Sequence, residues 1–233
     1  MARKPTRPPK GTAAAAAPRG GDSERERIIA AFMALLADKP IEQIGFAEIA
    51  EGAGVSLAEL RNTFGSTTAI LAAHMKEVDR AVLAGGDADM GEEPPRERLF
   101  DVLMRRIEIL APHKAAVRSL IRSASFNPGL ALALNGLAVR SQQWMLAAAD
   151  ISSSGPRGMM RAQGMALLFA SVLRTWVNDD DPGLARTMAA LDRALARGQR
   201  CSGLLDGALR MVACAGRPRR RRGDDADGET VAA

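Results

Sequence analysis

The spacing of the apolar residues limits the fold more than any other property of this sequence. Apolar side chains recur every three or four positions, as Ile28, Phe32 and Leu36 do, and nowhere alternate as in a half-buried strand. Tyrosine is absent and aromatic residues make up 3% of the chain, whereas alanine, leucine and methionine, which favour helices, are abundant. The sequence therefore predicts an all-α fold, with enough apolar residues for one large or two modest domains.

Prolines, glycines and short polar runs divide the chain into segments. They predict a disordered basic arm over residues 1–21, a first domain over 22–84, a helical domain over 95–214 and a disordered tail over 215–233. The boundary falls in residues 84–95, which are rich in glycine, proline and acids. The predicted helices of the second domain span residues 96–111, 113–126, 130–149, 157–177 and 184–197.

Three predicted helix starts rest on N-terminal capping. Ser23 with Glu26, and Ser56 with Glu59, have the spacing of a capping box, in which the hydroxyl and the carboxylate each satisfy a free backbone N–H. Asp181 is expected to cap a helix whose first residue is Pro182. That interpretation is preferred over a metal site for the acidic run at residues 179–181.

Residues 46–63 have the pattern of a helix-turn-helix motif. A short helix over 46–52 is followed by the turn Gly52-Ala53-Gly54 and a second short helix over 57–63. The second helix of such a motif reads base edges in the major groove of DNA. A similar helix pair also occurs in helical proteins that bind no nucleic acid, so the pattern leaves both interpretations open.

The same segment resembles the DNA-binding domain of TetR-type transcriptional regulators. The resemblance covers residues 23–83 and is carried by Ile49, Ala50, Ala53, Gly54, Val55, Ser56, Leu60, Phe64, Ser66 and either Ile70 or Leu71. It implies a three-helix head joined by a long helix to a helical-bundle C-terminal domain. In that family the C-terminal domain dimerises and often holds a small apolar effector, and no cofactor is implied.

The resemblance also implies which residues meet double-stranded DNA. Ser56, Leu57, Ala58, Arg61 and Asn62 are expected to face the DNA, and Thr63, Ser66 and Thr67 to meet backbone phosphates. The chain departs from the family pattern where Arg61 replaces a tyrosine and Thr67 replaces a lysine, and Arg61 can supply charge in their place. The basic arm is expected to add sequence-independent affinity, because phosphate contacts dominate non-specific binding.

A second resemblance gives an alternative function. Residues 96–120 and 173–195 resemble the ubiquinone-biosynthesis accessory family, whose members share the TetR-like fold. That resemblance implies a lipid- or isoprenoid-binding accessory protein without sequence-specific DNA binding.

Candidate ligand-binding residues are the large apolar side chains of two predicted core helices. Trp144, Met165, Phe169, Leu173 and Trp176 are expected either to line an effector pocket or to pack in the core or dimer interface. His74 and His113 are the only histidines, and each is expected to be structural and unpaired.

Charge and cysteine content narrow the function further. Residues 1–20 hold five basic residues and no acid, so the arm carries the whole net charge of +5. The two cysteines have no metal-ligand spacing, and no signal peptide or membrane span is evident, so a cytoplasmic location is expected. We find no catalytic motif and expect neither an enzyme nor a metal protein. The prediction is a homodimeric TetR-like regulator that binds DNA and not a membrane, and that is expected to act as a repressor.

Overall fold

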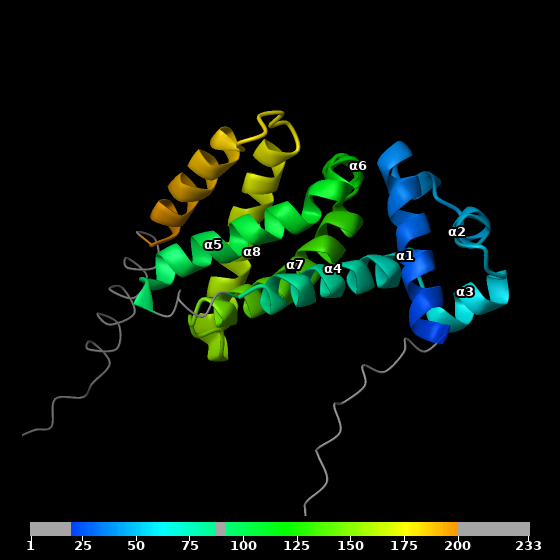
Figure 1. Cartoon of the computed structure of the whole chain (residues 1–233), viewed down its shortest axis with the longest axis horizontal. Helices are drawn as coiled ribbons and strands as arrows, with labels where there is room; N and C mark the ends of the chain where they lie inside the picture. The colour runs from blue at the N-terminus through cyan, green and yellow to red at the C-terminus, as the bar shows by residue number, and fades with distance from the viewer. Residues whose placement is uncertain (1–19, 87–91, 200–233) are drawn as a thin grey trace, which may run out of the picture.

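The computed structural model of the protein describes residues 20–86 and 92–199, and it is all-α over those residues (Figure 1). The N-terminal helices are α1 (Gly20–Asp38), the short η1 (Ile41–Gln43), α2 (Phe46–Ala53), α3 (Leu57–Thr63) and α4 (Thr67–Ala84). They are followed by α5 (Pro95–Leu110), η3 (Ala111–His113), α6 (Lys114–Phe126), α7 (Pro128–Ala148) and α8 (Gly155–Trp176). A last helix covers residues 185–199. These bounds lie within three residues of the predicted ones for every helix from α2 on.

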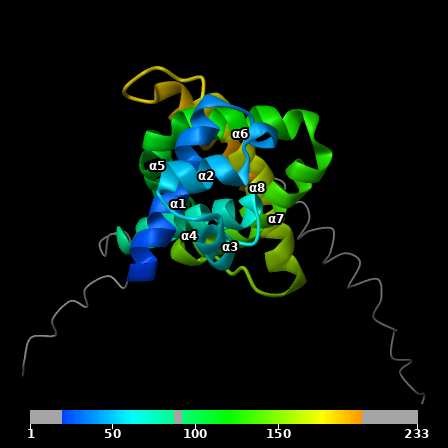
Figure 2. The same ribbon diagram turned by 90° about the vertical axis from the view of Figure 1, so that its right-hand side faces the viewer.

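The first three helices form a head at one end of the molecule, where α1, α2 and α3 face the viewer in Figure 2. Ile28 and Phe32 of α1, Ile49 of α2 and Leu60 of α3 are almost completely buried in one apolar cluster. Burying such side chains contributes about 1.5–3 kcal/mol each. The head thus has its own core, although α2 and α3 are short.

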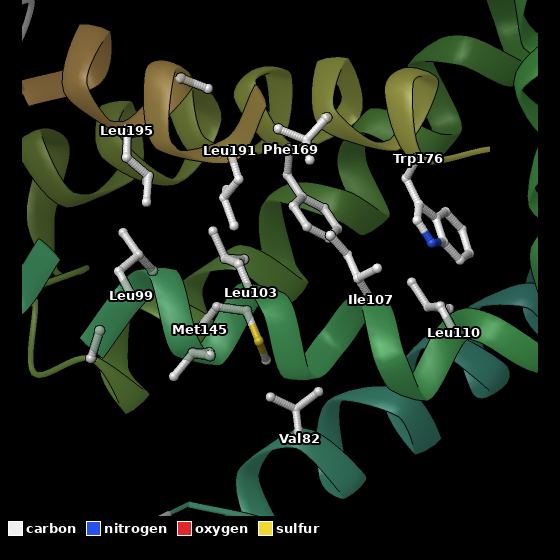
Figure 3. Packing of buried hydrophobic residues seen from close by; sticks show 14 of the residues in the cluster. Val82, Leu99, Leu103, Ile107, Leu110, Met145, Phe169, Trp176, Leu191 and Leu195 are labelled. Atoms are coloured by element: carbon white, nitrogen blue, oxygen red, sulfur yellow. The ribbon is translucent and has the colours of Figure 1, made fainter. Parts of the chain in front are cut away.

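The second core lies in the body, which comprises α5, α6, α7, α8 and the 185–199 helix. Figure 3 shows Leu99, Leu103 and Ile107 of α5 facing Phe169 and Trp176 of α8 and Leu191 and Leu195 of the last helix. Trp176 is 1% exposed. The turn before α8 passes so close to Gly158 that a Cβ atom there would lie 2.1 Å from the carbonyl carbon of Ser153, so only glycine fits at this crossing.

Helix α4 belongs to both cores. Ile70 and Leu71 near its start are buried in the head cluster, and Val78 and Val82 near its end are buried in the body cluster. The composition boundary at residues 84–95 therefore lies beyond the point where the two cores meet. Figure 1 shows α4 running from the head along the body, beside α5 and α7.

Helix α6 also links the two regions. Ala116 is buried in the head cluster, and the hydroxyl of Ser119 donates a hydrogen bond of 3.0 Å to the carbonyl of Lys39 at the end of α1. On its other side the guanidinium of Arg118 donates to the carbonyl of Val177, just after α8. The head is thus attached to the body through α6 as well as through α4.

Two predicted helix starts are wrong. α1 already begins at Gly20, so Ser23 lies inside its first turn and does not cap it. The last helix begins at residue 185 rather than at Pro182. Asp181 instead accepts hydrogen bonds from the backbone N–H groups of Gly183 and Ala185, because a turn at residues 182–184 precedes the helix. The predicted arm at residues 1–19 and tail from residue 200 lie outside the described residues.

No helix among residues 20–86 and 92–199 is both long and apolar enough to cross a membrane.

Candidate functional site

The turn between α2 and α3 has the geometry that the glycine spacing predicts. Gly54 adopts a left-handed conformation with φ of 62°, and the N–H of Val55 bonds to the carbonyl of Ala50 at 3.0 Å. A residue with a Cβ atom pays a steric penalty in that conformation. The chain therefore leaves α2 and enters α3 in a fixed direction.

Helix α3 is held at its start and along its inner side. The capping box predicted at Ser56 and Glu59 is confirmed: Ser56 N donates to Glu59 Oε2 at 2.7 Å, and Glu59 N donates to Ser56 Oγ at 3.2 Å. The hydrogen bond from Ser56 N, and after it the Ser56 side chain, lowers the pKa of the Glu59 carboxyl. Leu60 and Phe64 are buried in the head cluster and anchor the helix there.

The five residues expected to face DNA lie at the surface of α3 and its N-cap. Ser56, Leu57, Ala58, Arg61 and Asn62 are all exposed, whereas Leu60 is buried. Leu57 is 56% exposed. Within residues 20–86 and 92–199, the guanidinium of Arg61 makes one long contact, of 3.4 Å, with the carbonyl of Gly65. It therefore remains free to meet an anion.

Of the three residues expected to contact phosphates, Thr63 and Ser66 already form hydrogen bonds within the protein. The hydroxyl of Thr63 donates to Glu24 Oε1 at 2.9 Å, which ties the end of α3 to α1. Ser66 caps α4 by accepting a hydrogen bond from Ala69 N at 3.1 Å. Thr67 is partly exposed in the first turn of α4. Ser66 can still donate its hydroxyl proton, whereas Thr63 would have to release Glu24 first.

Two arginines of α1 lie beside α3, and sequence reasoning missed them. The guanidinium of Arg25 lies 4.8 Å from the centre of the Phe64 ring, in a cation–π contact. A Cβ atom on Gly54 would lie 3.6 Å from Nη1 of Arg27. Both precede the apolar stripe of α1, so local sequence offers only their charge as a signal.

The candidate effector residues do not come together in one site. Trp144 is 59% exposed on α7, although it was expected in a core helix, because within residues 20–86 and 92–199 no helix packs on that face of α7. Phe169 and Trp176 are buried in the core, and Leu173 packs against it. Of the five, only Met165 lines the cavity of about 650 Å³ that the described residues form between α5, α8 and the 185–199 helix.

The two histidines form a pair, contrary to the prediction that each stands by itself. The rings of His74 in α4 and His113 in η3 meet edge to face with their centres 4.7 Å apart. His74 is buried and its Nε2 has no hydrogen-bond partner. Burial, with smaller contributions from His113 and Arg106, lowers the pKa of His74 from 6.5 to about 4. Within the described ranges no three His, Cys, Asp or Glu side chains form a candidate metal site.

A buried ionic cluster joins α4 to two helices of the body, α5 and α7. Arg106 of α5 donates to Asp79 of α4 at 2.6 Å and to the hydroxyl of Ser141 of α7 at 2.5 Å. Ser141 Oγ also donates to Asp79 at 2.6 Å. Arg106 is 4% exposed, so its charge depends on Asp79 for compensation.

These features define the class of protein: an all-α chain with a helix-turn-helix head on a helical body. No protein-family model and no curated protein matches the sequence. Solved protein structures, in contrast, do match this chain. A TetR transcriptional regulator from Rhodococcus sp. RHA1 is similar with a TM-score of 0.56 and 23% identity, over 77% of this chain and 97% of that chain.

Two further structures agree. The TetR transcriptional regulator from Nitrosomonas europaea has a TM-score of 0.59 and 20% identity, over 75% of this chain and 97% of its own. A tetR-family transcriptional regulator from Streptomyces coelicolor has a TM-score of 0.51 and 17% identity, over 88% and 94%. The chain therefore has the fold of TetR-type transcriptional regulators, as the sequence resemblance implied.

Proposed function

We propose that the protein is a DNA-binding transcriptional regulator that acts as a homodimer, with α3 as the recognition helix. The observation that carries this proposal is the exposed side of α3, where Leu57, Arg61 and Asn62 project from a helix held by a capping box and by two buried anchors. A binding helix must be held rigidly if its side chains are to read base edges. The TetR-type fold supports the same conclusion.

The dimer would form through α8 and the 185–199 helix. Leu167 of α8 is 61% exposed and Met188 of the last helix 38% exposed. Ala170 and Arg174 continue the exposed stripe of α8 at helical spacing. Pairing two such faces across a two-fold axis would bury these apolar side chains in a four-helix bundle. Sedimentation at micromolar concentration tests this step, and a monomer would contradict it.

The lipid-carrier alternative has one observation in its favour, the apolar cavity beside α8. A cavity is compatible with both functions, because an effector of a regulator and the cargo of a carrier need the same kind of space. DNA binding separates the two. Selective binding to the DNA upstream of the protein's own gene is expected for a regulator and not for a carrier.

The experiment is a binding titration of that upstream duplex against a scrambled duplex, across a series of salt concentrations. Arg61→Ala is expected to weaken binding and to lower the slope of log affinity against log salt by about one, since it removes one phosphate contact. Arg140→Ala is the matched control, because Arg140 is an exposed arginine of α7 on the body. Equal affinity for both duplexes would overturn the proposal.

A further inference from the structure

The cavity beside α8 is buried and apolar at one end, and at its exposed end it is lined by arginines together with the apolar side chains of Met160 and Leu167. Its inner end is formed by Leu99 of α5, Leu146 of α7 and Leu195 of the last helix, which are all buried. Leu99 and Leu195 face each other across this space in Figure 3. Its mouth is formed by exposed residues of α8, including Arg157 and Gly164. At about 650 Å³ the cavity has the volume of a small-molecule site.

Among the described residues, the ionisable ones that line the cavity are all arginines: Arg96, Arg157, Arg161 and Arg197. Arg96 is neutralised by Asp192 and Glu97. Over the part of the chain that the structure describes, the other three make no ion pair with an acid. Arg161 donates to the carbonyl of Ser152 and Arg197 to the carbonyl of Arg193, and carbonyls leave the positive charge uncompensated.

We propose that this cavity binds an amphipathic anion, a molecule with an extended apolar chain and one carboxylate. The chain would enter between Leu99, Leu146 and Leu195, and the carboxylate would stay at the mouth with Arg157 and Arg161. Arginine pairs strongly with carboxylates because its planar group offers two parallel donors. An uncharged or cationic molecule of the same length would gain the apolar contacts without the ion pair.

The position of the mouth gives the ligand a regulatory consequence, and this consequence rests on the proposed function. Leu167 and Ser171 line the cavity and also lie on the stripe of α8 proposed for dimerisation. A ligand at the mouth therefore contacts the surface that would set the distance between two heads. It shifts that distance only if it binds one arrangement more tightly than the other.

The test is calorimetric titration of the full chain with dodecanoate, and with dodecan-1-ol and dodecyltrimethylammonium as probes of the same chain length. Saturable binding of dodecanoate, at least about tenfold tighter than the other two, is expected from one desolvated ion pair. Arg157→Glu should remove that preference, whereas Arg157→Lys should keep most of it. Equal binding of the three probes, or no binding, would overturn the proposal.

A second pair of variants tests the location. A Cβ atom at Gly164 meets nothing within 4 Å, so Gly164→Leu places its side chain in the cavity and should weaken dodecanoate binding about tenfold or more. Gly136→Leu is the matched control, because Gly136 is an exposed helical glycine of α7 with equally open space. Equal affinity in both variants would place the ligand elsewhere and overturn the proposal.

Failure of this site is distinguishable from failure of the proposed function. A chain that binds DNA selectively but ignores dodecanoate refutes the ligand and leaves the regulator. A chain that binds dodecanoate at Gly164 but not DNA keeps the site and refutes the regulator. If residues after Gln199 or a second copy fill the cavity, Gly164→Leu should lower thermal stability or dimer affinity without any dodecanoate binding, and the ligand proposal falls.

Discussion

The head and the body are built from the same kind of element, but different interactions define them. In the head, the boundaries of α2 and α3 follow from residues a few positions apart, such as Ser56 with Glu59 and the left-handed Gly54. In the body, the decisive polar contacts join residues far apart in sequence, such as Asp79 with Arg106 and Ser141. The comparison teaches that the candidate DNA-reading surface is locally specified, whereas the candidate ligand-binding region depends on tertiary packing.

The largest expected effect comes from breaking the buried cluster of the body. Asp79→Ala leaves Arg106 buried without its carboxylate, and loss of one partner of such a pair costs about 3–5 kcal/mol. Urea denaturation measures the loss of unfolding free energy. Because α4 carries residues of both cores, head and body should unfold in one transition, and two separate transitions would contradict this description of α4. The double variant Asp79→Leu with Arg106→Met should recover most of the loss, since it removes both charges.

The second effect is a pH dependence of stability at the joint between head and body. Since the pKa of His74 is lowered from 6.5 to about 4, the unfolded chain binds a proton between these pH values that the folded chain does not. The stability that neutral His74 provides is therefore complete above pH 6.5 and declines towards pH 4, by up to about 3 kcal/mol.

Denaturation midpoints measured from pH 7 to pH 4 test this dependence. His74→Leu should flatten the curve over that range, because the titrating group is gone. His113 packs against His74, Arg106 acts on it from α5, and Glu26 and Glu77 line the adjacent cavity. His113→Leu should keep most of the slope of stability against pH. An unchanged slope in His74→Leu would mean that His113, Glu26 or Glu77 causes the pH dependence instead.

A smaller effect is expected at the turn between α2 and α3, and it tests whether this turn requires Gly54. Gly54→Val forces a β-branched side chain into the left-handed conformation and should cost about 1–2 kcal/mol. Gly52→Ala, two residues earlier, is the control: its Cβ would lie 3.4 Å from the Cβ of Ala31 and its helical backbone accepts alanine. Thermal unfolding of both variants measures the difference. Equal costs would mean that the turn does not require its glycine.

The smallest effect is a gain in the body. Gly136→Ala should stabilise the protein by about 0.5–1 kcal/mol, because alanine favours an exposed helix position and nothing lies within 4 Å of the new Cβ atom. A rise of the denaturation midpoint measures it. A fall would indicate that the outer face of α7 is covered in solution.

Sequence reasoning succeeded where the signal is local. The bounds of α3 and its capping box follow from residues 56–64, and their spacing alone predicts them. The helix start predicted from the capping box at Ser23 is wrong because the helix extends back to Gly20. The same residue spacing can occur inside a first turn. Even a local motif therefore predicts a helix start only where the chain before it leaves the helical conformation.

Contacts between distant segments could not be predicted in this way. His74 and His113 meet although 39 positions separate them, and the exposure of Trp144 depends on which side of α7 its neighbours cover. Helical spacing indicates that a residue lies on an apolar face, but not what packs against that face. The same reason hid Arg25 and Arg27 beside α3 and the arginines around the cavity.

Helix α4, with Ile70 in one core and Val82 in the other, limits how such a protein can be recombined. A hybrid joined at residues 84–95 would transfer all of α4 with the foreign head. Val78 and Val82 of the foreign helix would then pack against a body core from a different protein. A junction inside α4, between Ala73 and Val78, would keep most residues of each core together. The exceptions are the residues of α6 and α7 that belong to the head cluster or pack against it: Ala116, Leu120, Leu130 and Leu134. Head and body are therefore expected to be inherited together rather than shuffled as interchangeable modules.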